Sequence, residues 1–285
     1  PADDDNGAAS GSAYVFTRSG ATWSQQAKLL PGNAAASDAF GTAVAVDGDT
    51  ALVGAPANAN PSKPGAAYVF TRSGTAWNEQ AALTAGDGSN SDRLAVKVSL
   101  DQDTAVVSRY NDNTLGNNAG AAYVFTRSGT AWSQQAKLLA SNGSSNDLFG
   151  YSVAVSGDTI ISGAIYSEVL TPLGGSAYAF TRSGGVWTEQ ADLIAEWSWA
   201  EGDEMGYAVA MNATWALVGA PGADGLMPDT GAVYVYRKLS GEWRYQTRLV
   251  AADGATGDRF GTSVALDGNT AVIGAGFADA NGADS

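Results

Sequence analysis

The chain has 285 residues, a formal net charge of −14, and neither cysteine nor histidine. This composition excludes disulfides, zinc–thiolate sites, and the side chain that most often serves as general base or metal ligand. The negative charge disfavours nucleic acid and anionic membrane as partners, and no apolar run is long enough to span a bilayer.

One pattern recurs five times along the chain. A tyrosine of the "AYVF" type recurs at steps of 54, 55, 55 and 56 residues, at Tyr14, Tyr68, Tyr123, Tyr178 and Tyr234. A tryptophan keeps the same steps, at Trp23, Trp77, Trp132, Trp187 and Trp243. An aspartate precedes Phe-Gly or a variant of it, at Asp38, Asp92, Asp147, Asp203 and Asp258. Several markers held in register indicate a repeat protein.

Each repeat is expected to form four short strands. In the first complete repeat these are residues 42–46, 51–55, 66–71 and 76–83, with turn residues between them. The first three are apolar on both faces, which is typical of strands covered on two sides. The fourth alternates, with Trp77, Glu79, Ala81 and Leu83 on one face. Four antiparallel strands per repeat, arranged around an axis, predict an all-β fold of the β-propeller type.

The stretches "FGTAVAVDGDTALVGAP" (40–56) and "RFGTSVALDGNTAVIGAG" (259–276) resemble the FG-GAP repeats of integrin α subunits, and most of all the bacterial variety. The resemblance covers essentially the whole chain. It implies a propeller and an adhesive, extracellular role. Family members carry calcium loops in some blades, but the turns at 47–50 and 267–270 offer too few oxygen ligands, so no metal site is expected there.

We expect one five-bladed propeller domain over residues 1–285. Four contiguous blades are predicted at about 40–84, 94–139, 149–194 and 205–250. The fifth is split: 260–285 supply its first two strands and 1–30 its last two, so that residues 12–30 hydrogen-bond alongside 260–276. The missing initiator methionine also fits a processed or partial chain.

Several recurring residues have a structural and a functional interpretation. The five aspartates are either a ring of cation ligands or carboxylates that accept backbone N–H groups in their own loops, and recurrence favours the second. The acidic segment 2–7 is either a weak calcium site or a solvated turn, with the turn favoured. We expect the tryptophans to pack between blades, the glutamines three residues after them to be polar edge residues, and the arginines of the "TRSG" turns to pair with carboxylates. No cofactor is expected.

Function is expected where the repeats differ. Tyr110 and Tyr166 lie in corresponding loops of neighbouring repeats, and Trp197 and Trp199 lie in the loop that follows. In a blade these loops emerge on one face, so the four aromatic side chains are candidate ligand-binding residues. The alternative is that Trp197 and Trp199 cap the core under a longer loop.

No catalytic set is recognisable. Histidine is absent, and no carboxylate pair stands out from the repeats, so we do not expect an enzyme. The leading hypothesis is a non-enzymatic interaction or adhesion module of a bacterial extracellular or cell-surface protein, with a protein or glycan as partner. The alternatives are a carbohydrate-binding propeller lectin, which should keep equivalent pockets in most blades, and a structural subunit of a surface fibre or layer.

Overall fold

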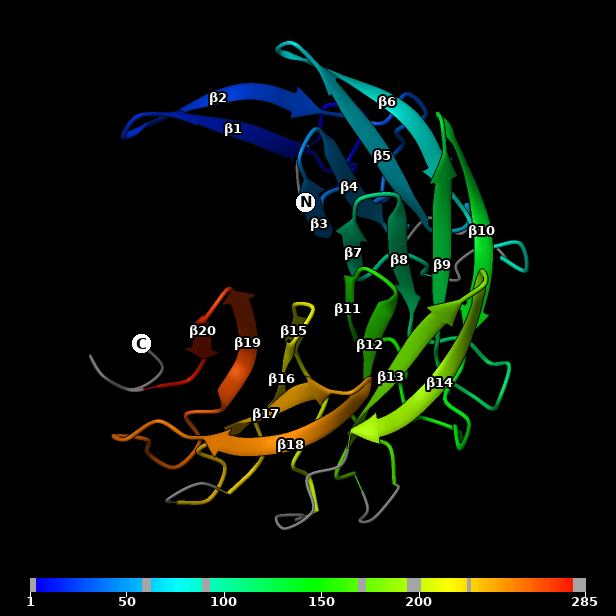
Figure 1. Cartoon of the computed structure of the whole chain (residues 1–285). Helices are drawn as coiled ribbons and strands as arrows, with labels where there is room; N and C mark the ends of the chain where they lie inside the picture. Colours follow the sequence, from blue (N-terminus) through cyan, green and yellow to red (C-terminus); the bar gives the residue numbers. More distant parts are fainter. Residues whose placement is uncertain are drawn as a thin grey trace. The chain divides into compact units, whose positions relative to one another are not determined.

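The computed structural model describes residues 4–57, 63–88, 93–168, 173–193, 201–224 and 227–278. These residues form β-strands joined by turns, and no helix occurs among them (Figure 1). The repeats thus produce an all-β fold, as the sequence predicts.

Four repeats each form a four-stranded antiparallel sheet whose strands pair in chain order. The first sheet comprises β3 (Ala43–Asp47), β4 (Thr50–Ala55), β5 (Ala66–Ser73) and β6 (Ala76–Leu83). The second comprises β7 (Val98–Asp101), β8 (Thr104–Arg109), β9 (Ala121–Ser128) and β10 (Ala131–Leu138). The third comprises β11 (Ser152–Ser156), β12 (Thr159–Ala164), β13 (Ser176–Ser183) and β14 (Val186–Leu193). The fourth comprises β15 (Val209–Met211), β16 (Trp215–Ala220), β17 (Ala232–Leu239) and β18 (Glu242–Leu249).

Two further hairpins form two-stranded sheets of their own. One consists of β1 (Ala13–Ser19) and β2 (Thr22–Leu29), and the other of β19 (Phe260–Asp267) and β20 (Thr270–Ala275). They contain the residues that the sequence assigns to the two halves of the predicted split blade. The pairing of residues 12–30 with 260–276, and with it closure into a five-bladed ring, stays a prediction.

Contacts between residues group the chain into two compact units. The first comprises 1–109 and 123–137, and the second comprises 110–122 and 138–285. The first therefore holds β1 to β8 and most of β9 and β10, and the second holds β11 to β20 together with the loop after β8. The assignment of the whole chain to a single domain stays a prediction.

The Phe of the Phe-Gly pattern anchors the core of its own sheet. Phe149 is fully buried, and its ring meets Tyr178 and Phe180 of β13 edge-on, with centroids 5.6 and 5.9 Å apart. Phe40 packs in the same way on β5. Leu94 and Met205 occupy the equivalent place in two other repeats and are also buried. Any large apolar side chain at this position therefore fills the same site.

The glycine of the Gly-Ala-Pro pattern marks a close approach between consecutive repeats of one unit. A β-carbon on Gly163, in β12, would lie closer than 3.0 Å to the carbonyl oxygen of Gly206 in the next repeat. Gly54 and Gly219 face a carbonyl of the following repeat in the same way. Glycine is needed at this position because the backbones of two repeats lie too close together for a β-carbon.

The recurring tryptophans and glutamines join neighbouring repeats of the first unit. The Trp77 indole N–H donates to Gln26 Oε1 at 2.8 Å, and the Trp132 indole N–H donates to Gln80 Oε1 at 2.8 Å. The expectation that the tryptophans pack between blades is confirmed for these two. Gln26 and Gln80 are not merely polar edge residues, because each accepts a hydrogen bond that links two repeats.

The strict alternation predicted for 76–83 is wrong. The register between β5 and β6 shifts at Val69/Phe70, where Phe70 pairs with Glu79 and Val69 pairs with Ala81. This β-bulge inserts one extra residue into β6 and changes the phase of the side chains. Glu79 is consequently exposed, while Gln80 is partly buried and available to Trp132.

The arginines of the turns pair as the sequence predicts. Arg127 donates to Asp103 at 2.6 Å and Arg182 to Asp158 at 2.7 Å, and Arg72 pairs with Asp49 in the same way. Arg18 differs, because its guanidinium donates to the backbone carbonyl of Gly20. These carboxylates are exposed, so each ion pair contributes little to stability.

Candidate functional site

The structure brings two of the four predicted site residues to one region of the second unit. Tyr110 directly follows β8, and Tyr166 follows β12. Trp197 and Trp199 lie outside the described residues, so the choice between a binding role and a capping role for them stays a prediction.

The loop that begins with Tyr110 is held by its own side chains. Asp112 is buried, and its carboxylate accepts the backbone N–H of Thr114 at 2.9 Å, while its carbonyl accepts that of Gly120 at 3.0 Å. Asn113 Oδ1 accepts the N–H of Asn118 at 2.8 Å. Such local bonds fix the loop, so Tyr110 is presented from a defined backbone.

Two tyrosines that were not singled out in the sequence complete the site. Tyr151 and Tyr207 each follow the glycine that ends the Phe-Gly pattern or its variant, in consecutive repeats. The Tyr151 N–H donates to Gly163 O and the Tyr207 N–H to Gly219 O, both at 3.2 Å. Because the local backbone is the same, the two side chains leave their repeats in the same direction.

Together these residues form what we term the tyrosine cluster: Tyr110, Tyr151, Tyr166 and Tyr207. The ring centroids of Tyr110 and Tyr151 lie 5.8 Å apart at an interplanar angle of 42°, and those of Tyr151 and Tyr207 lie 5.1 Å apart at 55°. All four residues are partly buried. The cluster therefore presents a row of tilted aromatic rings rather than isolated side chains.

The central ring of the tyrosine cluster stays protonated at neutral pH. Burial raises the pKa of Tyr151, and the neighbouring hydroxyl of Tyr207 and the charges of Tyr110 and Tyr166 add to the rise. A phenol with a raised pKa is a poor base and a poor nucleophile, but it remains a hydrogen-bond donor. Tyr151 is thus suited to hydrogen bonding rather than to proton transfer.

Acidic side chains border the tyrosine cluster. Glu168 is exposed and lies two residues after Tyr166. The backbone carbonyl of Asp147 accepts the Tyr166 N–H at 3.3 Å. Burial, together with the negative charge of Glu168, raises the pKa of the Asp147 carboxyl. Glu204 precedes Tyr207 by three residues and is ion-paired with Arg259. Arg109 directly precedes Tyr110 and pairs with Asp87 at 4.0 Å, so charges of both signs lie near the cluster.

The aspartates before the Phe-Gly pattern serve their own loops. Asp38, Asp147 and Asp258 each accept the backbone N–H of the residue three positions earlier, at 2.8, 2.7 and 2.7 Å. The structural interpretation is confirmed for these three. Asp203 is buried, and Asp92 lies outside the described residues.

No group of three or more acidic side chains that could hold a metal ion occurs within the described ranges. Residues 2 and 3 of the acidic segment 2–7 lie outside the described residues. In the rest of the segment, Asp4 Oδ1 accepts the Ala9 N–H at 2.7 Å, and Asp5 pairs with Lys28. Both carboxylates are thus engaged within the chain, which favours the turn. Calcium binding at this segment stays a prediction.

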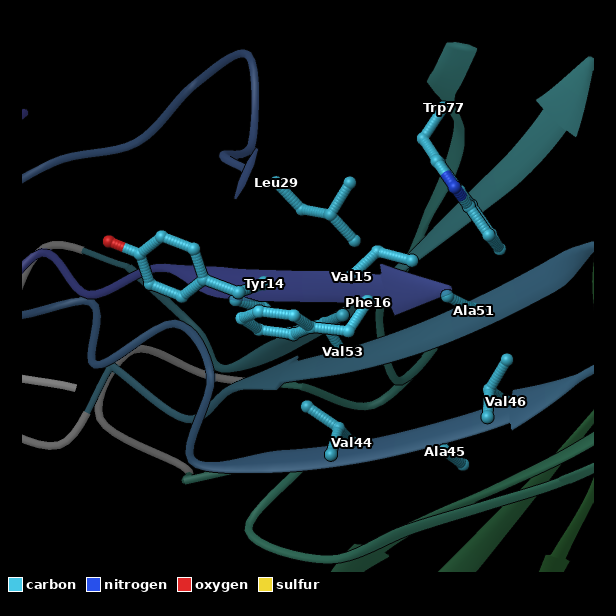
Figure 2. Close-up of a pocket in the computed structure, with 11 residues that line it drawn as sticks. Tyr14, Val15, Phe16, Leu29, Val44, Ala45, Val46, Ala51, Val53 and Trp77 are labelled. Atoms are coloured by element: carbon cyan, nitrogen blue, oxygen red, sulfur yellow. The ribbon is translucent and has the colours of Figure 1, made fainter. Parts of the chain in front are cut away.

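An apolar groove in the first unit is a second candidate site. Figure 2 shows Tyr14, Phe16, Val44 and Val46 around it, and its volume is about 350 Å³. Val44 and Val46 are 65% and 69% exposed. The expectation that the first strand of each repeat is covered on both faces is therefore wrong for β3, although it holds for β11, which is buried along most of its length. The groove is lined by residues of β1 to β4 together with Trp77, all in the first unit.

Asp192 in β14 is an unusual carboxyl. The equivalent position holds Lys28, Lys137 or Arg248 in other repeats, each above a tyrosine ring. Asp192 instead accepts a hydrogen bond from the Ser176 hydroxyl, and burial raises the pKa of its carboxyl to about 6, with Glu189 adding to the rise. Asp192 is thus a partly buried titrating group, and it forms no ion pair with any lysine or arginine of the described residues.

This carboxyl predicts a pH dependence of stability. A folded-state pKa of about 6, above the ordinary value of 3.8, means that the protonated form favours folding. The contribution is complete below about pH 4 and is lost as the pH rises through 6. Asp192→Asn should therefore raise the free energy of unfolding at pH 7.5 by about 1–2 kcal/mol, after allowance for solvent screening, and leave it unchanged at pH 4.

Urea denaturation of both proteins at the two pH values measures this difference. Asp253→Asn is the control, because it removes the same charge from an exposed position. An equal gain from both variants at pH 7.5 would show that relief of the net negative charge, and not burial of Asp192, is responsible.

Comparison with known protein families accounts for the repeat. The model of the FG-GAP repeat matches five consecutive times, at residues 23–70, 77–125, 132–180, 187–236 and 243–285. The chain belongs to the FG-GAP repeat family. FG-GAP repeats occur in integrin-like extracellular and adhesion proteins, and the family is generally non-enzymatic. Each match in this FG-GAP chain begins at one of the recurring tryptophans.

No curated protein matched this FG-GAP chain. A search of the described residues finds no helix that is both long and apolar enough to cross a membrane. FG-GAP repeats typically occur in extracellular domains. Family membership thus supports the repeat fold and is consistent with an extracellular domain, but it does not specify a ligand.

Proposed function

We propose that this FG-GAP chain is a non-enzymatic interaction module of a bacterial extracellular or cell-surface protein, and that it binds a partner protein through the tyrosine cluster. One observation carries the proposal: the equivalent residues Tyr151 and Tyr207 extend a row of rings that begins at Tyr110. Tyrosine is enriched at binding hot spots because a rigid, amphipathic ring provides contact area at low entropic cost.

The distribution of these tyrosines among the repeats favours a single binding region. The position held by Tyr151 and Tyr207 is occupied by Thr42, Val96 and Thr262 in the other repeats. A multivalent lectin would instead keep similar pockets in most repeats. A protein partner that contacts one face at one place fits this distribution better than a glycan bound at every repeat.

The proposal predicts that binding requires the two added rings. In the double variant Tyr151→Thr, Tyr207→Thr, each tyrosine is replaced by the residue that other repeats carry at that position, so the fold should be retained. Loss of two hot-spot residues should weaken binding by at least about 30-fold. The intact chain is first screened on arrays of extracellular proteins and of glycans. The affinity of each hit is then measured by titration with the original chain and with the double variant.

Trp23→Thr is the matched control, because Trp23 is an exposed ring, 63% accessible, in the first unit and outside the apolar groove. It should leave the affinity for the same hit within about twofold. Hits limited to glycans and dependent on Tyr151 and Tyr207 would establish the lectin instead. Protein hits that bind the double variant as tightly as the original chain would remove the tyrosine cluster from the interaction.

A further inference from the structure

The fourth repeat differs from the others along one row of residues across its sheet, in which β16, β17 and β18 are neighbours (Figure 1). Trp215 of β16 pairs with Arg237 of β17, and Arg237 pairs with Arg244 of β18. Residues directly opposite each other in antiparallel strands share one face, so we term these three the Trp-Arg-Arg row. Small polar residues hold the equivalent positions of the other complete repeats: Thr50, Thr71 and Asn78; Thr104, Thr126 and Ser133; and Thr159, Thr181 and Thr188.

The row holds two guanidinium groups side by side. Arg237 and Arg244 are both exposed, and like charges on directly opposite residues repel each other across a sheet. Arg244 pairs with Glu242 at 2.7 Å, but the two side chains are 61% and 72% exposed, so this ion pair is weak. Within the described ranges, no carboxylate lies at ion-pair distance from Arg237. The small polar residues of the other repeats avoid this repulsion, which indicates that the two arginines serve a ligand.

Trp215 holds Arg237 in place without using up its hydrogen-bond donors. The centre of the Arg237 guanidinium lies over the Trp215 ring, 5.4 Å from the ring centroid. An aromatic face attracts a guanidinium by its charge, so N–H groups of the arginine stay available to an anion. An arginine that is already restrained also loses less side-chain freedom when it binds. The row therefore combines one restrained arginine with a second arginine opposite to it.

The hairpin that carries the two arginines is basic in an otherwise acidic chain. β17 and β18 contain Arg237, Lys238, Arg244 and Arg248 but only one acid, Glu242, so their net charge is +3, four minus one. The whole chain has a net charge of −14. A negatively charged ligand is therefore attracted to this hairpin rather than to the acidic parts of the surface.

The two arginine positions stay accessible even where a following repeat covers the same face. In the first unit, Arg127 of the second sheet reaches the first sheet and donates to Thr50 at 3.1 Å. Thr71 is nevertheless only partly buried there, and Asn78 is exposed. The two arginines occupy the equivalent positions with longer side chains, so they reach solvent whether or not another repeat packs on this face.

We propose that the Trp-Arg-Arg row binds a sulfate ester group of a glycan. A guanidinium donates to two oxygens at once, so two opposed guanidinium groups favour an anion with three terminal oxygens over a carboxylate, which has two. Arg237, Arg244 and Glu242 together carry a net charge of +1, two minus one. This matches the single charge of a sulfate ester better than the nearly two charges of a phosphate ester. The row shares no residue with the tyrosine cluster, so the proposal does not depend on the proposed protein interaction.

The strand around Arg244 favours a sugar as the carrier of the sulfate group. Tyr245, Gln246 and Thr247 follow Arg244 and are exposed. Their hydroxyl and amide groups can donate hydrogen bonds to sugar hydroxyls and accept hydrogen bonds from them. A sulfated side chain of a protein is the alternative carrier, and the test below includes it as a contrary outcome.

Probes that differ in one part test the proposal. N-acetylglucosamine 6-sulfate carries both the sugar and the sulfate group. N-acetylglucosamine 6-phosphate changes the anion, sodium sulfate lacks the sugar, and unsubstituted N-acetylglucosamine lacks the anion. Each is titrated at pH 7.5 and constant ionic strength into the intact ¹⁵N-labelled chain. The arginine Nε–H signals and the backbone amide signals of β17 and β18 are followed by NMR.

We expect the Nε–H signals of Arg237 and Arg244 to shift with the sugar sulfate. They should saturate at a concentration at least about threefold lower than with the sugar phosphate or with sodium sulfate, and the unsubstituted sugar should not shift them. Equal or tighter binding of the phosphate would overturn the assignment to sulfate, and equal binding of sodium sulfate would overturn the assignment to a glycan. Tighter binding of tyrosine O-sulfate than of the sugar sulfate would assign the site to a protein ligand instead.

Two variants restore residues that other repeats carry, so the fold should be retained. Arg237→Thr and Arg244→Ser should each weaken binding of the sugar sulfate at least about fivefold. Lys97→Thr is the control, because it removes an exposed cation of the first unit, and it should leave the affinity within about twofold. The double variant Arg237→Lys, Arg244→Lys keeps the charge but loses the planar donors, so it should bind as weakly as the single variants. Undiminished binding by this lysine variant would show that general charge attraction, and not the row, holds the ligand.

The proposal and the proposed function fail separately. The double variant Tyr151→Thr, Tyr207→Thr should bind the sugar sulfate as tightly as the original chain does. Loss of sulfate binding in that variant would place the ligand at the tyrosine cluster and overturn the assignment to the row. Protein hits that depend on the tyrosine cluster should in turn be unaffected by Arg237→Thr.

Discussion

Gly163→Ala should be among the most damaging single substitutions in the second unit. We expect the free energy of unfolding to fall by about 3–5 kcal/mol, because the added methyl group would occupy the place of the Gly206 carbonyl oxygen. Ser152 Oγ, which donates to that carbonyl at 2.6 Å, would also lie 2.6 Å from the new carbon. Relief requires β12 to move away from the following repeat, and the buried contacts on both sides would be lost.

Gly157→Ala is the matched control. Gly157 lies in the turn of the same hairpin, and no atom lies within 4 Å of the β-carbon that alanine would add. Its φ of 57° strains an alanine, so its cost should be about 1–2 kcal/mol and should come from the backbone alone. Urea denaturation and hydrogen exchange of the β11–β12 amides measure both variants. Similar costs for the two would show that the repeats do not approach each other closely at Gly163.

Phe149→Ala is the second substitution with a large expected effect. The Phe149 ring is fully buried and meets two rings of β13, so its removal leaves a cavity that the rigid neighbours Tyr178 and Phe180 cannot fill. We expect a loss of about 3–5 kcal/mol in the free energy of unfolding. Because the residue begins the repeat, protection from hydrogen exchange should fall first in β11 to β14.

Phe149→Leu tests whether volume or aromaticity matters at this position. A leucine already occupies the equivalent place at Leu94, where it is fully buried. The cost of Phe149→Leu should therefore stay below about 1.5 kcal/mol. If leucine proved as costly as alanine, the edge-to-face contacts with Tyr178 and Phe180, rather than filling of the core, would have to carry most of the stability.

The repeat structure could be predicted because each marker residue has one local physical role. Segments 42–46, 51–55, 66–71 and 76–83 agree with β3 to β6 within two residues at each end. Turn residues and apolar runs are local signals, so a single sequence was sufficient to predict the boundaries of these strands. The phase of the fourth strand was predicted wrongly because a β-bulge at Gln80 depends on pairing with β5, which no pattern within 76–83 reveals.

Only two of the four residues of the tyrosine cluster were predicted from the sequence. Tyr110 and Tyr166 stood out because their loops differ from those of other repeats. Tyr151 and Tyr207 did not, because they lie just before the first strand of an ordinary repeat. Their departure from Thr42 or Thr262 appears only when that single position is compared across repeats. The distance between rings of different repeats is set by packing of the repeats, which sequence periodicity does not give.

In the repeat that contains β3 to β6, Trp77 donates a hydrogen bond to Gln26 of the preceding repeat, and Gln80 accepts one from Trp132 of the following repeat. This repeat therefore carries both a donor and an acceptor for hydrogen bonds to its two neighbours. Duplication of this whole repeat would create a new contact in which a tryptophan donor again meets a glutamine acceptor. A crossover between the tryptophan and the glutamine of one repeat would place the two residues in different repeats. A duplication of this repeat that keeps both contacts must therefore contain Trp77 and Gln80 together.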